Sequence, residues 1–259
     1  MFDYLGNPVD GNILFDGNMT MDYAFDSTSG TNYTALRIFK RRRDGTNQYP
    51  FVRKVPSQTY SALDLGVAEG WELVINAGMG QGIVIENGVV ITDESAVKHA
   101  GAMPLTIDGS GDLWYAEADT TGKGAQMVTD GIVSAVCGFF PIIVNFEDYD
   151  YPKDIPETIE LPGWVHAQRQ IIGQYGNGDY AILTCDGRNF NNSTGWSIEE
   201  AQSICKELGI KFAYNLDGGG STGVVLRKKQ LNLIYEGTTG RKMPTFIVFN
   251  GTTRFGIPD

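Results

Sequence analysis

Short hydrophobic runs, rather than long amphipathic stretches, dominate the chain from Tyr33 onward. Examples are TALRIF, ELVINAG, GIVIENGVVIT and LTIDGSGDLWYAEA. Asp-Gly and Asn-Gly dipeptides lie within and between such runs, and these dipeptides are the strongest short signals of a β-hairpin. The pattern predicts a β-rich, largely antiparallel body.

One later segment is predicted to contain a helix, because its apolar residues recur at helical rather than strand spacing. Residues 180–185 (YAILTC) read as a buried strand, and Ser197 and Glu200 have the spacing of a capping box at the start of a helix. Apolar residues then recur at helical spacing, and Gly209 is placed to end the helix. Since residues 210–216 read as another strand, we expect a βαβ unit with parallel strands. The expected fold class is α+β, a β-rich mixed sheet body with a C-terminal βαβ unit that carries the site.

The first 30 residues are rich in Gly, Asn, Asp, Ser and Thr and contain only isolated hydrophobic residues. We interpret residues 1–30 as an arm or connector and residues 31–259 as one domain. The start of the chain has neither the basic nor the apolar region of a signal peptide, and no run of 18 apolar residues occurs. We expect no membrane span and no signal peptide, with a virion-associated or a cytoplasmic location.

Charge and cysteine content narrow the functional classes. The net charge of -11 argues against nucleic-acid binding, which draws its affinity from clustered Lys and Arg. Three cysteines with no CxxC spacing indicate neither a disulfide framework nor a zinc site, so we expect buried free thiols.

The stretch YNLDGGGST, residues 214–222, is the most unusual in the chain. It places Asp217 before three glycines, and Asp186-Gly187 follows the preceding strand of the predicted βαβ unit. Both aspartates should therefore lie at carboxyl ends of strands, on the edge of the sheet where ligands bind in open α/β sheets. Successive glycine amides can form an anion-binding nest, while the alternative is a tight turn that Asp217 stabilises.

Three better-known glycine motifs do not fit this loop. A P-loop needs a Lys directly after its glycines, and the next Lys is Lys228. A Rossmann turn leads into a helix, whereas residues 224–226 (VVL) read as a strand. The GxSxG pattern around Ser221 needs a His later in the chain, but both histidines, His99 and His166, precede it.

A series of motifs, in order, resembles the phosphodiester glycosidase family. They are NAG at 76–78, LTIDGSGDL, HAQRQIIG at 166–173, DGR at 186–188, GWSIEEAQSICKELGIKFAYNLDGGGST and GRKMP at 240–244. The resemblance spans about residues 70–249, and the block from DGR to NLDGGGS is specific. Gln168 and Gln170 flank Arg169 where the family commonly has Pro and Thr.

The resemblance implies a hydrolase that cleaves a sugar-1-phosphodiester, of the N-acetylglucosamine-1-phosphate type, at the anomeric carbon. It assigns catalysis to Asp217, with Asp186 as partner and His166 as an acid or base. The substrate-binding residues would be Arg188 and Arg169 on phosphate, Asn76 on a sugar hydroxyl, and the loop residues Gly218, Gly219, Gly220, Ser221 and Thr222.

Each assignment has a plainer alternative. Asp186 with Arg188 could be a turn-stabilising ion pair, Asn76 a turn residue, His166 an ordinary loop histidine, and Ser221 with Thr222 a cap of the turn. No cofactor is certain, although Asp108, Asp112, Asp186 and Asp217 could supply oxygen ligands for calcium, so the metal stays unknown.

The N-terminal arm, rich in Asn, Gly and Asp, and the short, compact chain resemble phage or prophage tail-associated members of the family. The expected substrate is then a phosphate-linked surface glycan such as teichoic acid, with virion tail proteins as partners through the arm. Two alternatives remain open: a non-catalytic glycan-binding or structural virion protein, and an intracellular hydrolase of nucleotide-like phosphodiesters.

Overall fold

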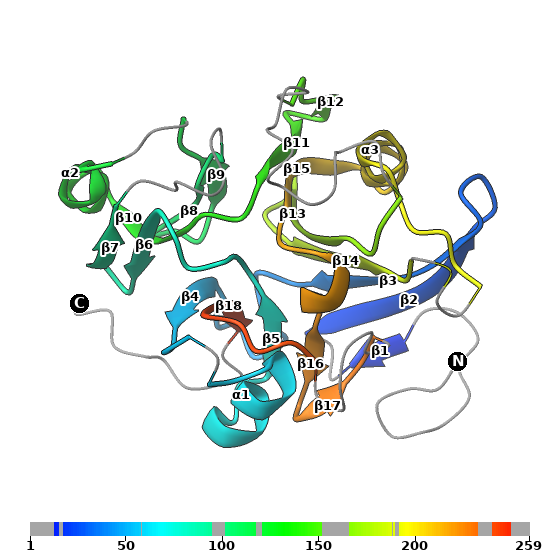
Figure 1. Ribbon diagram of the computed structural model, residues 1–259, viewed down its shortest axis with the longest axis horizontal. Helices are drawn as coiled ribbons and strands as arrows, with labels where there is room; N and C mark the ends of the chain where they lie inside the picture. Colours follow the sequence, from blue (N-terminus) through cyan, green and yellow to red (C-terminus); the bar gives the residue numbers. More distant parts are fainter. Residues whose placement is uncertain are drawn as a thin grey trace.

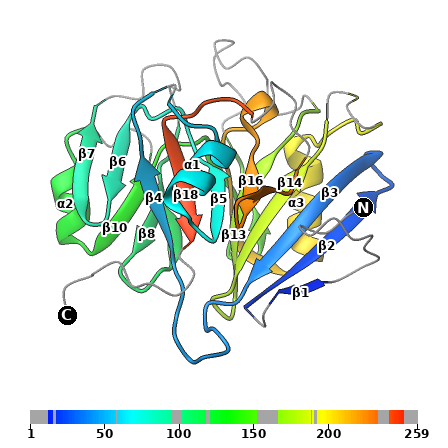
Figure 2. The ribbon, with the colours of Figure 1, turned by 90° about the horizontal axis from the view of Figure 1, so that it is seen from below.

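The computed structural model describes residues 13–15, 18–57, 59–94, 102–117, 121–151, 166–187, 189, 192–232 and 240–249. These residues fold into three antiparallel β-sheets that surround a central core (Figures 1 and 2). The largest sheet, called the eight-stranded sheet, has the order β1 (Ile13–Phe15), β2 (Met19–Asp26), β3 (Thr31–Ile38), β14 (Tyr180–Cys185), β13 (Gln170–Tyr175), β15 (Ile210–Asn215), β11 (Phe140–Val144) and β12 (Glu147–Asp148).

Two five-stranded sheets complete the body. The first, called the β8 sheet, has the order β7 (Val89–Asp93), β6 (Ile83–Glu86), β10 (Ile132–Val136), β8 (Leu105–Asp108) and β9 (Leu113–Tyr115). The second, called the β5 sheet, has the order β17 (Lys229–Gln230), β16 (Val224–Leu226), β5 (Leu73–Asn76), β18 (Thr245–Phe249) and β4 (Pro50–Lys54).

A helix covers the outer face of each sheet. Helix α1 (Ala62–Glu69) packs on the β5 sheet, α2 (Gly124–Thr129) on the β8 sheet and α3 (Ile198–Glu207) on the eight-stranded sheet. Strands between two apolar layers need hydrophobic residues on both faces, which explains runs such as LVIN and YAILTC that do not alternate with polar residues. The observed fold is therefore the predicted β-rich α+β class.

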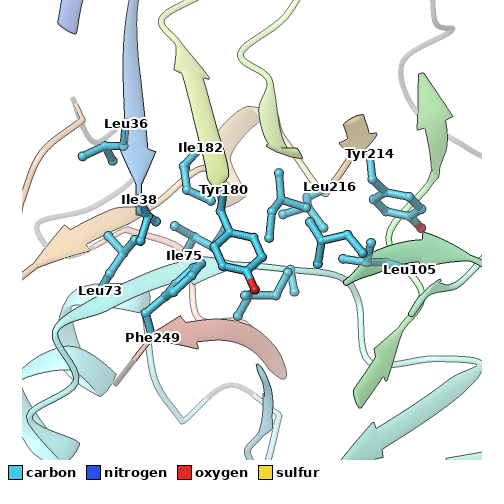
Figure 3. Packing of buried hydrophobic residues seen from close by; sticks show 14 of the residues in the cluster. Leu36, Ile38, Leu73, Ile75, Leu105, Tyr180, Ile182, Tyr214, Leu216 and Phe249 are labelled. Atoms are coloured by element: carbon cyan, nitrogen blue, oxygen red, sulfur yellow. The ribbon is translucent and has the colours of Figure 1, made fainter. Parts of the chain in front are cut away.

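Alternate residues of these strands enter different cores. In β14, Ile182 points into the central core, while Ala181 and Leu183 contact the layer beneath α3. Figure 3 shows Tyr180 near the middle of the central core, where its ring meets Phe249 at a centroid distance of 5.5 Å. The Tyr180 hydroxyl donates to the carbonyl of Gly111 at 2.8 Å, so this buried polar group is satisfied.

The predicted βαβ unit is present, but its two strands are not neighbours. The capping box of Ser197 and Glu200 starts α3, and Gly209 follows the helix with φ of +71°, as the sequence predicts. Strands β14 and β15 run in the same direction because each pairs antiparallel with β13, which lies between them. The insertion of β13 keeps the two carboxyl ends on one edge and places the start of β13 between them.

The segment interpreted as a connector contains sheet structure. Strand β2 pairs with β3 along its whole length, and Met19 and Met21 are buried in the central core. The described part of residues 1–30 therefore belongs to the sheet, and the boundary at residue 30 does not separate it from the domain. Residues 1–12 and 16–17 lie outside the described ranges.

The three cysteines are buried and unpaired, as the sequence predicts. Burial raises the pKa of the Cys137 thiol to about 11 and that of Cys185 to about 12. Among the described helices, none combines the length and the apolar character needed to cross a bilayer.

Gly78 lies where the β5 and β8 sheets meet, and a Cβ atom at this position would overlap the carbonyl group of Cys137. We expect Gly78→Ala to lower the free energy of unfolding by about 2 to 3 kcal/mol, because backbone must move to make room. Urea denaturation measures the effect.

Gly109→Ala is the matched control, because its added Cβ would meet only a methyl of Val133 at 3.8 Å. We expect it to change the free energy of unfolding by about 0.5 kcal/mol or less. Equal effects of the two substitutions would contradict the close approach at Gly78.

Candidate active site

The glycine loop connects two sheets. It leaves β15 of the eight-stranded sheet, forms a single 3-10 turn, η1 (Gly219–Ser221), and enters β16 of the β5 sheet. The amide of Asp217 donates to the carbonyl of Ala77 at 2.9 Å, and the amide of Gly219 donates to the carbonyl of Gln168 at 2.9 Å. The loop is thus fixed from both sides.

Asn76 holds this loop with both ends of its side chain. Its Nδ2 donates to the carbonyl of Asp217 at 2.6 Å, and its Oδ1 accepts from the amide of Gly223 at 2.9 Å. The residue is fully buried. The structure therefore corrects the expected role of Asn76 as a sugar ligand, because its polar atoms already satisfy backbone groups and it positions Asp217 instead.

Close packing and backbone conformation require two of the three glycines. A Cβ on Gly218 would overlap the carbonyl oxygen of Gln168, and Gly219 has φ of +57°, which favours glycine. The amide of Ser221 donates to the carbonyl of Gly218, and that of Thr222 to the carbonyl of Gly219. These amides and that of Gly219 already have carbonyl partners, so these three are not open to a phosphate as the expected nest requires.

Asp217 has the most unusual electrostatic environment of the loop. Its carboxylate accepts from the Ser221 hydroxyl and the Gly218 amide, yet its Oδ2 atom is buried without a hydrogen-bond partner among the described residues. Burial is the largest influence and raises the pKa of Asp217 to about 6, against the lowering effect of those bonds and of the Arg241 charge. A carboxyl group that titrates near neutrality is suited to acid, base or nucleophilic chemistry.

Arg241 is a site residue that the sequence interpretation missed. It precedes β18, its Nη1 donates to the Ser221 hydroxyl at 3.2 Å, and its charge acts on Asp217. Three side chains therefore form a chain of contacts from Arg241 through Ser221 to the carboxylate. The sequence does contain an indication, because Arg241 is the arginine of the GRKMP motif. The motif alone does not identify the side chain that this arginine contacts.

The two Asp-Gly turns lie on opposite sides of Gln168. A Cβ on Gly187 would come within 2.6 Å of the Gln168 amide nitrogen, while one on Gly218 would overlap its carbonyl oxygen. Asp186 and Asp217, which precede these glycines, are thereby brought to either side of the start of β13. The predicted gathering of both aspartates at one edge of the sheet is observed.

Arg169 and Asp186 are both buried beside this edge. The Arg169 Nε donates to the carbonyl of Trp196 at 3.0 Å, which turns part of the guanidinium toward the layer beneath α3. Both charges act on the Cys185 thiol, with Arg169 lowering and Asp186 raising its pKa, so the two side chains lie near the same sulfur atom. Arg188 lies outside the described residues.

His166 is less closely connected to the two aspartates. Its ring is 43% exposed, and Nε2 lies 3.1 Å from the carboxylate of Glu200 in the first turn of α3. Glu200 also caps that helix, so the contact joins His166 to the helix start. No contact of His166 with Asp217 or Asp186 is found within the described ranges.

Several buried polar atoms around the loop are left without partners among the residues that the structure describes. They include Oε1 of Gln168, Oδ2 of Asp217 and Oγ1 of Thr222. Buried polar atoms are normally paired, so three unsatisfied ones around one loop indicate a place that receives a polar ligand or water. Gln168 was not singled out in the sequence except as a departure from the family pattern.

The four aspartates considered for calcium do not form one group. Asp112 accepts from Gln174 near the end of β13, whereas Asp217 lies beside its start. In the described part of the chain, no three His, Cys, Asp or Glu side chains are grouped to hold a metal ion.

The raised pKa of Asp217 predicts a pH-dependent cost in stability. Its ordinary value is 3.8 and its folded value about 6, so the unfolded chain ionises first as pH rises and the free energy of unfolding falls between those values. We expect Asp217→Asn to be more stable than the wild type at pH 8 by up to about 3 kcal/mol, with the gain lost near pH 4. Urea denaturation at both pH values measures it.

Asp44 provides a control whose pKa shift is opposite in direction, because hydrogen bonds from Thr46 lower the pKa of this exposed carboxyl group. Asp44→Asn should bring no gain at pH 8. A difference between Asp217→Asn and the wild type that is the same at pH 4 and pH 8 would contradict the raised pKa.

Solved structures share this fold. The catalytic domain of zebrafish N-acetylglucosamine-1-phosphodiester alpha-N-acetylglucosaminidase, auto-inhibited by its pro-peptide, matches with a TM-score of 0.68 over 90% of this chain and 82% of that one, at 15% identity. A hypothetical protein from Synechocystis matches with a TM-score of 0.62 over 90% of this chain and 62% of that one, at 14% identity. These identities establish likeness of fold alone.

Sequence comparison adds a relative and a family. The SPbeta prophage-derived protein YomE of Bacillus subtilis is 25% identical over 251 residues, and the match covers 85% of this chain but only 36% of YomE. The model of the phosphodiester glycosidase family matches residues 65–250, a range that contains both Asp-Gly turns, the glycine loop and Arg241. The resemblance noted in the sequence is thus confirmed, and the chain belongs to the phosphodiester glycosidase family.

Proposed function

We propose that this protein hydrolyses a sugar-1-phosphodiester at the anomeric carbon, with Asp217 as the essential carboxylate. The observation that carries the proposal is the carboxyl group of Asp217. Its Oδ2 atom is buried with no partner among the described residues, its pKa is raised to about 6, and it contacts Ser221 beside Arg241. Family membership supports the reaction class, and the fold shared with the zebrafish N-acetylglucosamine-1-phosphodiester alpha-N-acetylglucosaminidase supports an N-acetylglucosamine-1-phosphodiester as substrate type.

The reaction breaks the bond between the anomeric carbon and the phosphate oxygen. The electron pair of that bond leaves with the phosphate, which becomes a phosphomonoester, and water supplies the new oxygen on the sugar carbon. Positive charge develops on the sugar ring in the transition state, so an ionised carboxylate beside the anomeric carbon stabilises it or attacks it. Because the phosphate departs as a stable anion, the ionised form of Asp217 is the working form.

The phosphate requires positive charge and hydrogen-bond donors. Arg241 is the strongest candidate, because residue 241 is exposed and its guanidinium already reaches the Ser221 hydroxyl. Arg169 is buried, and its Nε donates to the carbonyl of Trp196. It therefore stabilises the phosphate by the electrostatic attraction of its positive charge rather than by direct contact. The Thr222 hydroxyl supplies a further donor, and Arg188 stays a candidate on the strength of its DGR motif.

The biological substrate that we favour is a phosphate-bridged glycan of a bacterial surface, such as a teichoic acid. The prophage origin in the name of YomE supports this choice and a virion-associated role, with tail proteins as partners of the N-terminal segment. The two other roles, a glycan-binding or structural virion protein and a hydrolase of nucleotide-like phosphodiesters, are distinguished by the substrates used in the assay.

The first test measures free N-acetylglucosamine released from three substrates. They are a purified teichoic acid that holds this sugar through a 1-phosphodiester, a methyl phosphodiester of N-acetylglucosamine-1-phosphate, and UDP-N-acetylglucosamine. We expect Asp217→Asn to lower kcat/KM by about 100-fold or more, because the carboxylate acts only in the transition state. Arg241→Ala should lower it by about 100-fold through loss of charge on the phosphate.

Asp44→Asn serves as the control, since Asp44 is exposed in a turn and accepts from the amide and hydroxyl of Thr46. Wild-type turnover in the Asp217→Asn variant would overturn the assignment. Binding of teichoic acid without turnover of any of the three substrates would establish a binding protein instead, and turnover of the nucleotide sugar alone would identify the soluble substrate class.

The dependence of kcat/KM on pH tests the protonation state of Asp217. Because the pKa of Asp217 is about 6 in the free protein, we expect kcat/KM to fall tenfold per pH unit below that value as the carboxylate is protonated. The profile is measured with the methyl phosphodiester between pH 4 and 9. A kcat/KM that rises as pH falls through 6 would show that Asp217 works as an acid.

A further inference from the structure

A groove lies at the other end of β15 from Asp217. It has a volume of about 590 Å³ and is bounded by β8, β9, α2 and the turn between β13 and β14. This volume is within the range of sites that bind small molecules, roughly 300 to 1,000 Å³. Its lining includes Asp108, Asp112, Trp114, Asp130, Lys211 and Phe212.

Trp114 forms a flat aromatic platform on the wall of this groove. Its side chain is 42% exposed, although Trp is among the largest apolar residues. One face stacks on the buried ring of Phe212, at a centroid distance of 5.5 Å and an interplanar angle of 28°. Tyr115 is nearly parallel to Phe212 at 8°. The Trp114 ring is thus held in place by packing, while its other side is open to a partner.

Three carboxylates line the same groove and retain unused acceptor capacity. The Oδ1 atom of Asp108 accepts from the amides of Ser110 and Asp112. The Oδ1 atom of Asp130 accepts from the side-chain amide of Gln126. Asp112 likewise accepts through Oδ1, from Lys40 and Gln174. Since a carboxylate has two oxygens, each Oδ2 can accept from a ligand.

The charge of the groove favours an uncharged ligand over an anionic one. Three carboxylates and Lys211 line it, and Lys40 pairs with Asp112, so one net negative charge remains and disfavours a phosphorylated or otherwise anionic ligand. An uncharged sugar ring fits better, because it has an apolar C–H face that stacks on an aromatic ring and hydroxyl groups that donate to carboxylates. We propose that this groove is a carbohydrate-binding site for a neutral glycan segment, with Trp114 as its platform.

The groove is separate from the candidate active site. Phe212 lies near the start of β15 and Asp217 follows its end, five residues or about 16 Å along the strand. The turn between β13 and β14 lies at the opposite edge of the sheet from the carboxyl ends of β14 and β15 (Figure 2). A glycan bound at Trp114 therefore leaves Asp217 accessible, and the groove keeps the protein on a glycan independently of any reaction.

Direct binding tests the proposal without relying on hydrolysis. The neutral hexasaccharides of β-1,4-linked glucose and of β-1,4-linked N-acetylglucosamine are titrated into the whole chain, with calorimetry as readout. We expect at least one to bind, Trp114→Ala to weaken binding by about tenfold or more, and Trp114→Phe to retain most of it. Asp130→Asn should weaken binding without loss of fold.

Phe25→Ala is the matched control, since Phe25 is 60% exposed and lies on β2, away from the groove. It should bind as the wild type does. Failure of both hexasaccharides to bind, unchanged binding by Trp114→Ala, or tighter binding of an anionic oligogalacturonate would each overturn the proposal. Release of N-acetylglucosamine from the methyl phosphodiester should be unchanged in Trp114→Ala, so failure of the hydrolase proposal is seen in a separate assay.

Discussion

The close approach of two Asp-Gly turns to the backbone of Gln168 determines the geometry of the candidate site. Gly187 and Gly218 pack against the same residue from opposite sides, at distances that leave no room for a Cβ atom. That contact brings the ends of β14 and β15 to the start of β13. The aspartates that precede the two glycines are consequently held together by backbone, which moves far less than side chains do.

Local signals made part of this arrangement predictable. The capping box of Ser197 and Glu200, together with Gly209, depends on residues within one helix, so α3 could be placed from the sequence. Asp186 and Asp217 follow strands joined by that helix, and the direction of the chain alone puts them on one edge. The same reasoning could not place β13 between the strands, because its pairing joins residues far apart in the chain.

Other features depend on partners that no local pattern specifies. The glycine run suggested an anion nest, but whether an amide is open depends on carbonyls such as that of Gln168, 51 residues away in the chain. Asn76 was expected to face a sugar, and its actual partner, the carbonyl of Asp217, is visible only in the folded protein. Arg241 was missed for the same reason, whereas β2 was missed because its buried Met19 and Met21 stand among turn-forming residues.

The hydrogen bond from Asn76 to Asp217 joins residues 141 positions apart and ties the β5 sheet to the eight-stranded sheet. Closing so long a segment costs chain entropy that is recovered only when both sheets have packed. Before they dock, Asp217 is a solvated carboxyl group with an ordinary acidity. The unusual acidity of Asp217 is therefore a property of the docked pair of sheets and is present in neither sheet alone.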